Sequence, residues 1–373
     1  MHIGIDARVL EKKMTGIGRY LLDILQGIQS DKENQYYLFS VNEINWVTGP
    51  FIKVNTGNFK IPDKLYSPYW LNFILPKLVK KYGIDLYFSP NHLLPKIKMD
   101  CKSVVAIHDL HHLTNKQNHS FFYRNYLNFQ LPTSIRNSDA IIAISENTKV
   151  DLIKNFSVDE IKIKVIYRVA DNKFKPYSLT DLEYNSIKAK LNLPEKYVLF
   201  VGMIENRKNI MGILKTADIV YKKNPDLKFL LVGRPGYGFN SLKKEILKRK
   251  NVIYLNYVEE EDIISIYNLA FLFLFPSHYE GFGLPPLEAM QCGIPVLCSN
   301  IQSLQEVVGD NGLLRNAADY KGFADDILNL ISDPKLYANM QKRSIDQAKK
   351  FSYEDSINKL KTIFNDLKIE SQV

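Results

Sequence analysis

The sequence predicts two doubly wound α/β domains, and three observations support this. The chain has 373 residues, which at roughly 100–200 residues per domain is enough for about two domains. Short apolar runs of strand length alternate with amphipathic stretches of helix length, as in a parallel sheet covered by helices on both faces. This alternation stops in a polar stretch and then starts again, so each half of the chain is expected to build its own sheet.

The candidate strands are bounded by polar or turn-forming residues and can be placed one by one. In the first half we expect strands at residues 3–6, 85–89, 103–109, 140–145 and 164–167. In the second half we expect them at residues 196–202, 227–233, 252–258, 271–277 and 294–300. The stretch between Ala170 and Lys190 is polar, contains Pro176 and lacks an apolar run. It is expected to join a first domain of residues 1–175 to a second domain of residues 190–352.

The last element is expected to be a helix over residues 353–370. Ser352 is a suitable N-cap, and Asp355 falls in the first turn, where acidic residues favour a helix. An apolar stripe then recurs at helical spacing through Ile357, Leu360, Ile363, Phe364 and Leu367. This helix therefore needs an apolar surface to pack against.

The composition is that of a folded protein with excess positive charge. Hydrophobic residues make up 46% and charged residues 24%, which excludes an intrinsically disordered chain. The 49 Lys and Arg residues exceed the 40 Asp and Glu residues by nine. Residues 1–175 hold 24 of these cations and 16 of these anions, a net +8. The first half is therefore expected to face an anionic partner.

Cysteine usage and hydropathy predict a protein of the cytoplasm. Cys101, Cys292 and Cys298 include no CxxC pair, which favours a reducing compartment over a disulfide framework or a zinc site. The first residues lack the pattern of a signal peptide. The longest apolar runs, such as that from Leu269 to Phe275, fall far short of the roughly 20 residues that span a membrane.

The most informative stretch is SHYEGFGLPPLE, from Ser277 to Glu288, which follows an apolar strand. Glu280 would lie at the carboxyl end of this strand, where open α/β sheets bind ligands, and Glu288 one to two turns into the next helix. The backbone N–H groups at the start of that helix favour an anionic group between the two carboxylates. The alternative is an ordinary solvated helix start with acidic residues near it.

A second cluster, GMIENRKN, also comes directly after a strand. Its Arg207 and Lys208 would supply fixed positive charge to a phosphate, because arginine binds two oxygens at once and lysine acts as a point charge. Adjacent basic residues in a loop are also commonly just solvated, so this alternative stays open at the level of the residues alone.

Taken together, these segments resemble the retaining glycosyltransferases of family 4. The resemblance rests on EGFGLPPLE, on GMIENRKN, on the opening IDARVL with TGIGRY, and on the strand-end HDL at 108–110, and it runs from residue 3 to about residue 355. It implies the GT-B fold, in which two Rossmann-like domains face each other across a cleft and the last helix crosses back to the first domain. The opening and the HDL resemble the bacterial mannosyltransferase-like members that build O-antigen and other surface polysaccharides.

The resemblance also implies roles for residues of the second domain. Glu280 would contact the donor sugar or its phosphate, and Glu288 the ribose hydroxyls. Arg207 and Lys208 would bind the diphosphate, with the backbone amides of Phe282, Gly283 and Leu284. One departure from the family pattern is Met203, which stands where members often carry an arginine.

In the first domain the resemblance points to the glycine loop and to a histidine. Gly16 and Gly18 would let the backbone approach the diphosphate, although a plain tight turn before a helix at Arg19–Gln26 is the alternative. His108 would face the donor sugar, as a polar group at the reacting centre. The run His108, Asp109, His111 and His112 can also be interpreted as a metal cluster, but the family generally needs no metal, and none is expected here.

The resemblance implies a retaining hexosyl transfer without a cofactor. The donor is expected to be GDP-mannose or a UDP-sugar, and the acceptor a lipid-linked saccharide or polysaccharide. Lys77, Lys80 and Lys81 lie in an aromatic-rich stretch and are candidates for contact with the acceptor or an anionic membrane, unless they are simply solvated.

Two other functions are weighed: a nucleotide-sugar 2-epimerase on the same fold, and a basic nucleic-acid-binding protein. Nucleic acid is not expected as a partner.

Overall fold

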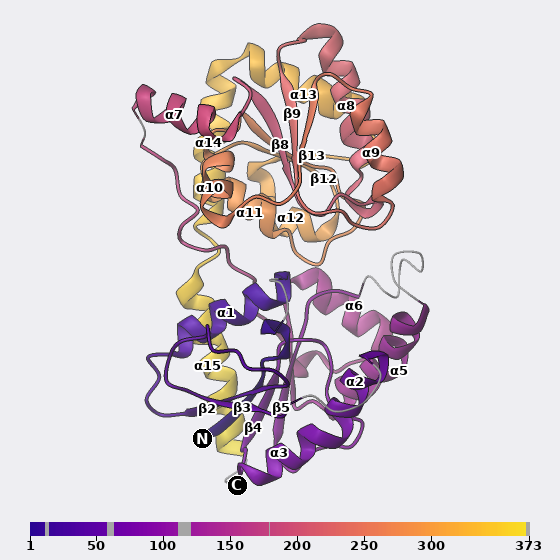
Figure 1. Ribbon diagram of the computed structural model, residues 1–373, viewed down its shortest axis with the longest axis vertical. Helices are drawn as coiled ribbons and strands as arrows, with labels where there is room; N and C mark the ends of the chain where they lie inside the picture. The colour runs from indigo at the N-terminus through magenta and orange to yellow at the C-terminus, as the bar shows by residue number, and fades with distance from the viewer. Residues whose placement is uncertain (12–14, 58–62, 111–120, 179, 371–373) are drawn as a thin grey trace. The chain divides into compact units, whose positions relative to one another are not determined.

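The computed structural model divides the chain into two compact units (Figure 1) and describes residues 1–11, 15–57, 63–110, 121–178 and 180–370. The first unit comprises Met1–Arg168 together with Tyr353–Val373, and the second comprises Val169–Ser352. Each unit contains one parallel β-sheet. The described helices include none that is both long and apolar enough to cross a bilayer.

The first unit is built on a seven-stranded parallel sheet. Its strands lie in the order β3-β2-β1-β4-β5-β6-β7. Strands are therefore added toward one edge from β1 to β3 and toward the other edge from β4 to β7, and this order reverses between β1 and β4. The strands are β1 (His2–Asp6), β2 (Gln35–Ser40), β3 (Phe51–Asn55), β4 (Leu86–Ser89), β5 (Lys102–Ile107), β6 (Ala140–Ala143) and β7 (Ile163–Val165). Such a reversal leaves the carboxyl ends of β1 and β4 free of crossing helices, which is where α/β sheets bind ligands.

Helices cover both faces of this sheet and enclose two cores. On one face α1 (Gly16–Ile28) and α15 (Tyr353–Glu370) pack over β1, β2, β4 and β5. The other face is covered by α2 (Asp63–Tyr69), a π-helical turn at Trp70–Ile74, α3 (Leu75–Lys81), α5 (Phe121–Asn137) and α6 (Glu146–Phe156). Short, aliphatic strands such as β6 are buried along their whole length, because both faces are covered.

The C-terminal helix packs on the first unit, and its expected apolar stripe is confirmed. All five residues of the stripe, from Ile357 to Leu367, are buried in the core that α1 shares. Tyr353 Oη donates to the backbone oxygen of Asp23 in α1 at 2.6 Å. A Cβ atom on Gly27 would lie 2.5 Å from Ile357, so glycine is required where the two helices meet. Figure 1 shows α15 beside α1.

The second unit has a six-stranded parallel sheet in the order β10-β9-β8-β11-β12-β13. Its strands are β8 (Tyr197–Val201), β9 (Lys228–Val232), β10 (Val252–Leu255), β11 (Leu272–Phe275), β12 (Val296–Ser299) and β13 (Leu313–Arg315). Its helices are α7 (Asp181–Leu191), α8 (Ile210–Lys223), α9 (Phe239–Leu247), α10 (Glu260–Asn268), α11 (Leu284–Gln291), α12 (Gln302–Val308), α13 (Tyr320–Ser332) and α14 (Pro334–Ala348). Here the reversal falls between β8 and β11, which pair directly.

The structure differs from the sequence prediction in three strands and one boundary. Strands β2, β3 and β13 were not predicted, and each fills a place at or next to the edge of its sheet. Residues 169–175 belong to the second unit and not to the first domain. The reason is local packing, since Phe174 is buried with its ring 5.5 Å from that of Tyr267.

The unit boundaries also weaken the predicted charge asymmetry. The C-terminal helix is slightly acidic, and Lys173 and Lys175 fall in the second unit. The first unit therefore carries 25 Lys and Arg against 19 Asp and Glu, a net +6, and the second carries 24 against 21, a net +3. The excess still favours the first unit, but it is no longer confined to it.

Candidate active site

The candidate site of the second unit lies at the carboxyl edge of its sheet. Strands β8 and β11 pair in parallel, with Leu272 opposite Val198, so the turns that follow them lie side by side. After β8 the chain forms a 3-10 turn at Asn206–Lys208, and after β11 it runs through Glu280 to the start of α11. The sheet topology thus brings together two segments separated by about seventy residues.

Asn209 fixes the first of these turns against the second. It takes the left-handed conformation, with φ of 55°, and its Oδ1 accepts from the Gly212 backbone N–H at 3.1 Å as the N-cap of α8. Its Nδ2 donates to the backbone oxygens of Pro276, at 3.0 Å, and Ala317, at 2.7 Å. This buried side chain therefore positions Arg207 and Lys208, which directly precede it.

Glu280 is held between the two predicted cations. Its Oε1 lies 2.6 Å from Lys208 Nζ, and its Oε2 lies 3.1 Å from Arg207 Nη1. Arg207 also donates to the backbone oxygen of Tyr279 and pairs with Glu205 at 2.8 Å. Glu280 is 8% exposed and Lys208 7%, so the structure forms a nearly buried ion cluster, called here the Glu280 cluster (Glu205, Arg207, Lys208 and Glu280).

Charge and burial act against each other in this cluster. Burial alone would raise the pKa of Glu280, but the charges of Lys208 and Arg207 outweigh it and hold that pKa below its ordinary value. Burial lowers the pKa of Lys208, while Glu280 raises it in part. The Glu280 cluster therefore keeps Arg207 and Lys208 fixed at the edge of the sheet, with Glu280 ionised between them.

The start of α11 completes this edge. Gly283 has φ of 136°, and a Cβ atom there would lie 2.7 Å from Leu304, so the backbone can take this path only with glycine. Leu284 is the first residue of the helix, and the first N–H groups of a helix have no acceptor within it. The Phe282 side chain is buried, with its ring 5.7 Å from that of Phe351, so only its backbone is available to a ligand.

Glu288 lies in the same helix but is not part of the cluster. It is buried at 7% exposure, and its Oε2 accepts from the Tyr267 hydroxyl at 2.7 Å. Tyr267 belongs to α10, so this hydrogen bond joins α10 to α11 and holds the carboxylate in place. Its predicted contact with ribose hydroxyls stays a prediction.

The glycines of the first unit belong to a helix and not to the loop that was predicted. Helix α1 begins at Gly16, because the Thr15 hydroxyl accepts from the Gly18 backbone N–H at 3.1 Å and caps the first turn. The backbone oxygen of Gly16 accepts from Arg168 Nη2 at 2.9 Å. The two glycines therefore form the N-terminal turn of α1, next to a cation.

His108 follows β5 directly, as predicted, and is 6% exposed. Its Nε2 lies 2.8 Å from the backbone oxygen of Pro90, and its Nδ1 has no hydrogen-bond partner among the described residues. Its ring stacks on His92 at 5.3 Å and meets Tyr20 edge-on at 4.8 Å. Burial, followed by the charges of His92 and Arg168, holds the pKa of His108 well below its ordinary value. The ring is therefore neutral, donates through Nε2, and offers Nδ1 as an acceptor.

A cavity of about 520 Å³ lies at the carboxyl edge of the first sheet. Arg8 lines it, paired to Asp6 at 2.6 and 2.9 Å, with its guanidinium 3.9 Å from the centre of the Trp70 ring. Other polar lining residues are Glu11, Thr15, Asn42, Tyr66, Ser67 and Asn91. Sequence reasoning missed this cavity, because most of its residues follow β1, β2 or β4, two others lie in α2, and β2 was not predicted.

Lys77, Lys80 and Lys81 lie in α3 and are exposed. The same helical segment exposes Tyr69 by 37% and Phe73 by 58%, with their rings 5.2 Å apart.

Among the described residues, no three His, Cys, Asp or Glu side chains come together as a metal site requires. His111 and His112 lie outside the described residues, so the expectation that no metal is needed stays untested.

Two family models match the chain. The model "Glycosyl transferases group 1" matches residues 183–347, and "Glycosyltransferase Family 4" matches residues 14–174. The chain is 31% identical to the O-antigen chain mannosyltransferase B of Escherichia coli, over 74% of this chain and 73% of that protein. It is 28% identical to the O-antigen chain mannosyltransferase RfbU of Salmonella typhimurium, over 86% of this chain and 88% of that protein.

Solved structures with little sequence identity share the fold. Sucrose-phosphate synthase from Thermosynechococcus elongatus is 19% identical, with a TM-score of 0.79 over 99% of both chains. HepE from Anabaena, solved in complex with UDP and glucose, is also 19% identical, with a TM-score of 0.75 over 98% of this chain and 99% of that one. The GT-B fold is therefore confirmed as two units with parallel Rossmann-like sheets.

Proposed function

The chain belongs to the glycosyltransferases of family 4, and we propose that it transfers mannose from GDP-mannose to a growing surface polysaccharide, with retention of anomeric configuration and without a metal ion. The observation that carries this proposal is the Glu280 cluster, which fixes two cations beside a helix start at the ligand-binding edge of the second sheet. The choice of mannose rests on the O-antigen mannosyltransferases that resemble the chain over most of its length.

In this proposal the cluster binds the donor diphosphate. Lys208 and Arg207 are held in place by Glu280 before the donor arrives, so binding does not have to order their side chains. The backbone N–H groups of Gly283, the N-cap of α11, and of Leu284, its first residue, add the positive end of a helix dipole. The fixed donors of Arg207 and Lys208, with charges balanced by the two carboxylates of the cluster, act together with the helix start to stabilise the leaving diphosphate, the purpose that a divalent metal ion serves in other transferases.

The proposed reaction is a transfer on one face of the sugar. The bond between the anomeric carbon and the diphosphate oxygen breaks, and a bond from the same carbon to an acceptor oxygen forms on the same face. The acceptor proton goes to the leaving phosphate oxygen. We assign Glu280 to the donor sugar, and we assign Glu288 to the ribose hydroxyls. We assign His108 the role of a hydrogen-bond acceptor through its unpartnered Nδ1, since its lowered pKa leaves it neutral at physiological pH.

We assign the acceptor to the 520 Å³ cavity of the first unit. Its hydroxyl, amide and carboxylate groups suit the hydroxyls of a saccharide, and Arg8 suits a phosphate, because its guanidinium presents donors in a rigid fork. The guanidinium is positioned by Asp6 and by the face of Trp70, so it enters the cavity with little freedom to lose.

We further propose that the exposed face of α2 and α3 rests on an anionic membrane. Tyr69 and Phe73 offer apolar surface, and Lys77, Lys80 and Lys81 offer about 1 kcal/mol each near such a surface. Reversing the three lysines to glutamate should weaken binding to vesicles containing phosphatidylglycerol by at least about a hundredfold at low salt. The matched control reverses the exposed Lys222, Lys223 and Lys243 of the second unit. Equal binding by the two triple variants would contradict the membrane proposal.

The function is tested with a panel of nucleotide-sugars and a lipid-diphosphate-linked saccharide acceptor, in buffer containing EDTA. The expected result is mannosyl transfer from GDP-mannose, with an α-linkage visible in the NMR spectrum of the product. Glu280→Gln should lose transfer, whereas Glu259→Gln, at an exposed carboxylate of the same unit, should retain it. Transfer from a different donor sugar, an inverted linkage, or conversion of the donor without acceptor would each contradict the proposal.

A further inference from the structure

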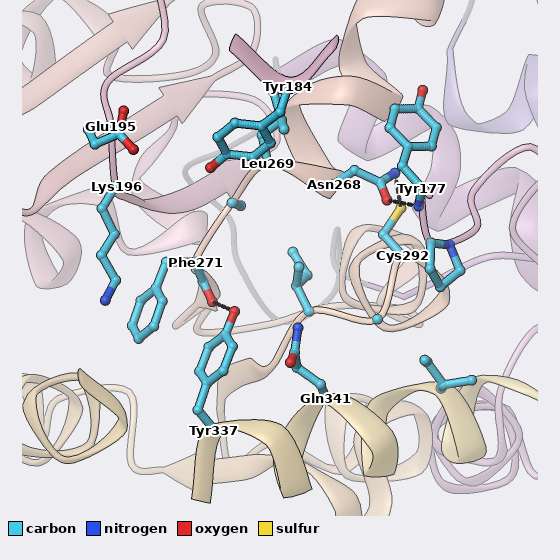
Figure 2. Close-up of a pocket in the computed structure, with 15 residues that line it drawn as sticks. Tyr177, Tyr184, Glu195, Lys196, Asn268, Leu269, Phe271, Cys292, Tyr337 and Gln341 are labelled. Atoms are coloured by element: carbon cyan, nitrogen blue, oxygen red, sulfur yellow. Dashed lines mark hydrogen bonds between the residues drawn. The ribbon is translucent and has the colours of Figure 1, made fainter. Parts of the chain in front are cut away.

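A second cavity lies at the opposite edge of the second unit's sheet from the Glu280 cluster. It has a volume of about 600 Å³, within the range of roughly 300–1,000 Å³ typical of small-ligand sites (Figure 2). It is lined by residues that come just before strands: Lys196 directly before β8, Phe271 directly before β11 and Ile294 two residues before the start of β12. The Glu280 cluster follows β8 and β11, so the two sites occupy the amino and carboxyl edges of one parallel sheet.

Aromatic rings form one part of the cavity wall. Tyr337 of α14 lies flat on Phe271, with ring centres 4.7 Å apart and planes 4° from parallel, and its hydroxyl donates to the Phe271 backbone oxygen at 2.9 Å. Figure 2 shows Lys196 on the other side of Phe271, and its Nζ lies 3.9 Å from the ring centre. Tyr184 of α7 and Tyr177 line further parts of the wall. The stacked rings of Phe271 and Tyr337 are thus held in place before any ligand binds.

Polar groups stand among these rings. Figure 2 shows the Gln341 side chain pointing from α14 into the cavity, and its amide has no hydrogen-bond partner among the described residues. Asn268 is held more firmly, since its Oδ1 accepts from the Tyr177 backbone N–H at 2.8 Å and its Nδ2 donates to the Ile264 oxygen at 3.0 Å. Glu195 adds a carboxylate at the rim.

The electrostatics of this cavity disfavour an anion. Helix α10 ends at Asn268 and helix α11 ends at Gln291, so both present the negative ends of their dipoles toward it. Glu195 adds a carboxylate that is already paired with Lys188 Nζ at 3.1 Å, and Lys196 is the single cation among the described lining residues, already placed over an aromatic ring. The Glu280 cluster balances its two cations with two carboxylates and lies beside a helix start, which carries the positive end of a dipole. A phosphate or nucleotide is therefore suited to the carboxyl edge and not to this one.

We propose that this cavity binds neutral hexose residues of a glycan chain, at a site separate from the transfer reaction. A sugar ring presents C–H groups on its faces, which pack on aromatic rings, and hydroxyls around its rim, which hydrogen-bond to amide and carboxylate groups. Tyr184, Tyr337, Gln341 and Glu195 supply both kinds of partner. The choice of mannose as the hexose rests on the proposed function, whereas the cavity chemistry does not depend on it.

The test measures binding of α-linked mannotriose to the full chain by titration calorimetry and saturation-transfer NMR. Gln341→Ala removes one amide and should weaken binding about 2- to 10-fold, and Tyr184→Ala removes a ring and should weaken it about tenfold or more. Asn339→Ala, an exposed amide on the same helix, is the matched control and should change nothing. Melting temperatures check that each variant is folded. If Tyr184→Ala does not fold, Gln341→Ala alone still tests the cavity.

Two further measurements separate this inference from the proposed function. Transfer to a short acceptor should be unchanged in Gln341→Ala, whereas elongation of a long acceptor should fall. Mannotriose binding that weakens in Gln341→Ala supports the cavity even if the chain transfers no mannose. Binding unchanged in both cavity variants, no binding to the wild-type chain, or displacement of mannotriose by inorganic phosphate would overturn the inference even if mannose is transferred.

Discussion

Replacing Glu280 by alanine should destabilise the second unit as well as stop transfer. The substitution removes a carboxylate that lies 2.6 Å from Lys208 Nζ and 3.1 Å from Arg207 Nη1, and it leaves Lys208, 7% exposed, without its counter-charge. A buried cation in this situation keeps the full cost of its removal from water and loses the attraction that offset it. Arg207 is less affected, because it keeps its pairing with Glu205 at 2.8 Å.

The expected magnitude follows from these contacts. Removing one partner of a buried ion pair costs about 3–5 kcal/mol, and Glu280 is shared by two cations, so we expect the upper part of that range. For a unit of 184 residues this corresponds to a fall in melting temperature of about 8–20 °C. Glu280→Gln keeps the shape and one hydrogen bond to Arg207, so its cost should be smaller, about 1–3 kcal/mol.

The assay can follow the two units separately. Trp46 and Trp70 are the two tryptophans of the chain and both lie in the first unit, so tryptophan emission reports on that unit while circular dichroism reports on both. Glu280→Ala should lower the unfolding transition seen by circular dichroism and move the emission transition little. A double-mutant cycle with Lys208→Met should show a coupling of at least about 2 kcal/mol. A free energy of unfolding within about 1 kcal/mol of wild type would mean that the ion cluster is not formed in solution, and the reasoning would fail.

Three further predictions concern the first unit. Gly27→Ala should lower the free energy of unfolding in urea by about 1–3 kcal/mol, because the added Cβ would lie 2.5 Å from Ile357. The double variant with Ile357→Ala should lose less than the sum of the two single losses, and additive losses would show that α1 and α15 do not pack closely. Burial, His92 and Arg168 lower the pKa of His108, so its neutral form stabilises the fold above pH 6.5, and that stability should be lost as pH falls, by up to about 1.4 kcal/mol per pH unit. His108→Gln should flatten this dependence, and an unchanged slope would contradict a neutral His108. Arg8→Lys should raise the KM for a phosphate-bearing acceptor about tenfold with little change in the KM for the donor, because an ammonium group cannot bind two oxygens at once as a guanidinium does. An unchanged acceptor KM would remove Arg8 from the acceptor site.

The sequence predicted most of the fold because the inner strands of each sheet are continuous apolar runs. Strands such as β5 and β11 are buried on both faces, so their sequence carries no polar alternation that could be confused with a loop. Two of the missed strands behave differently, whereas β2 is buried at five of its six residues and was missed for no such reason. Strand β13 is short and half-exposed, and β3 carries Lys53 and an exposed Asn55, so their pattern is that of ordinary surface chain. Only pairing with a neighbouring strand gives such segments their structure.

The candidate site was predicted in part, and the limits have a physical cause. Glu280, Arg207 and Lys208 each follow a strand, so a parallel sheet with paired β8 and β11 must bring them to one edge. Asn209 and Glu205 lay in a stretch that the sequence had singled out, yet their roles depend on hydrogen bonds to Pro276 and Ala317 and on the side-chain direction of Arg207. Pro276 and Ala317 are distant in the chain, and the direction of the Arg207 side chain is set by folding, so spacing supplies neither. The cavity at the amino edge was missed for the same reason, since it has no motif and is formed by residues before three different strands.

The two edges of the second sheet can serve different ligands because a parallel sheet gives them opposite electrostatics. In a doubly wound unit the helices that follow the strands begin near the carboxyl edge and end near the amino edge, so helix starts gather at one edge and helix ends at the other. The charged side chains are paired at both edges, in the Glu280 cluster at the carboxyl edge and between Glu195 and Lys188 at the amino edge, so the helix ends supply the difference. A charged nucleotide-sugar and a neutral glycan would thus be separated by the direction of the strands, and a substitution at one edge should leave binding at the other unchanged.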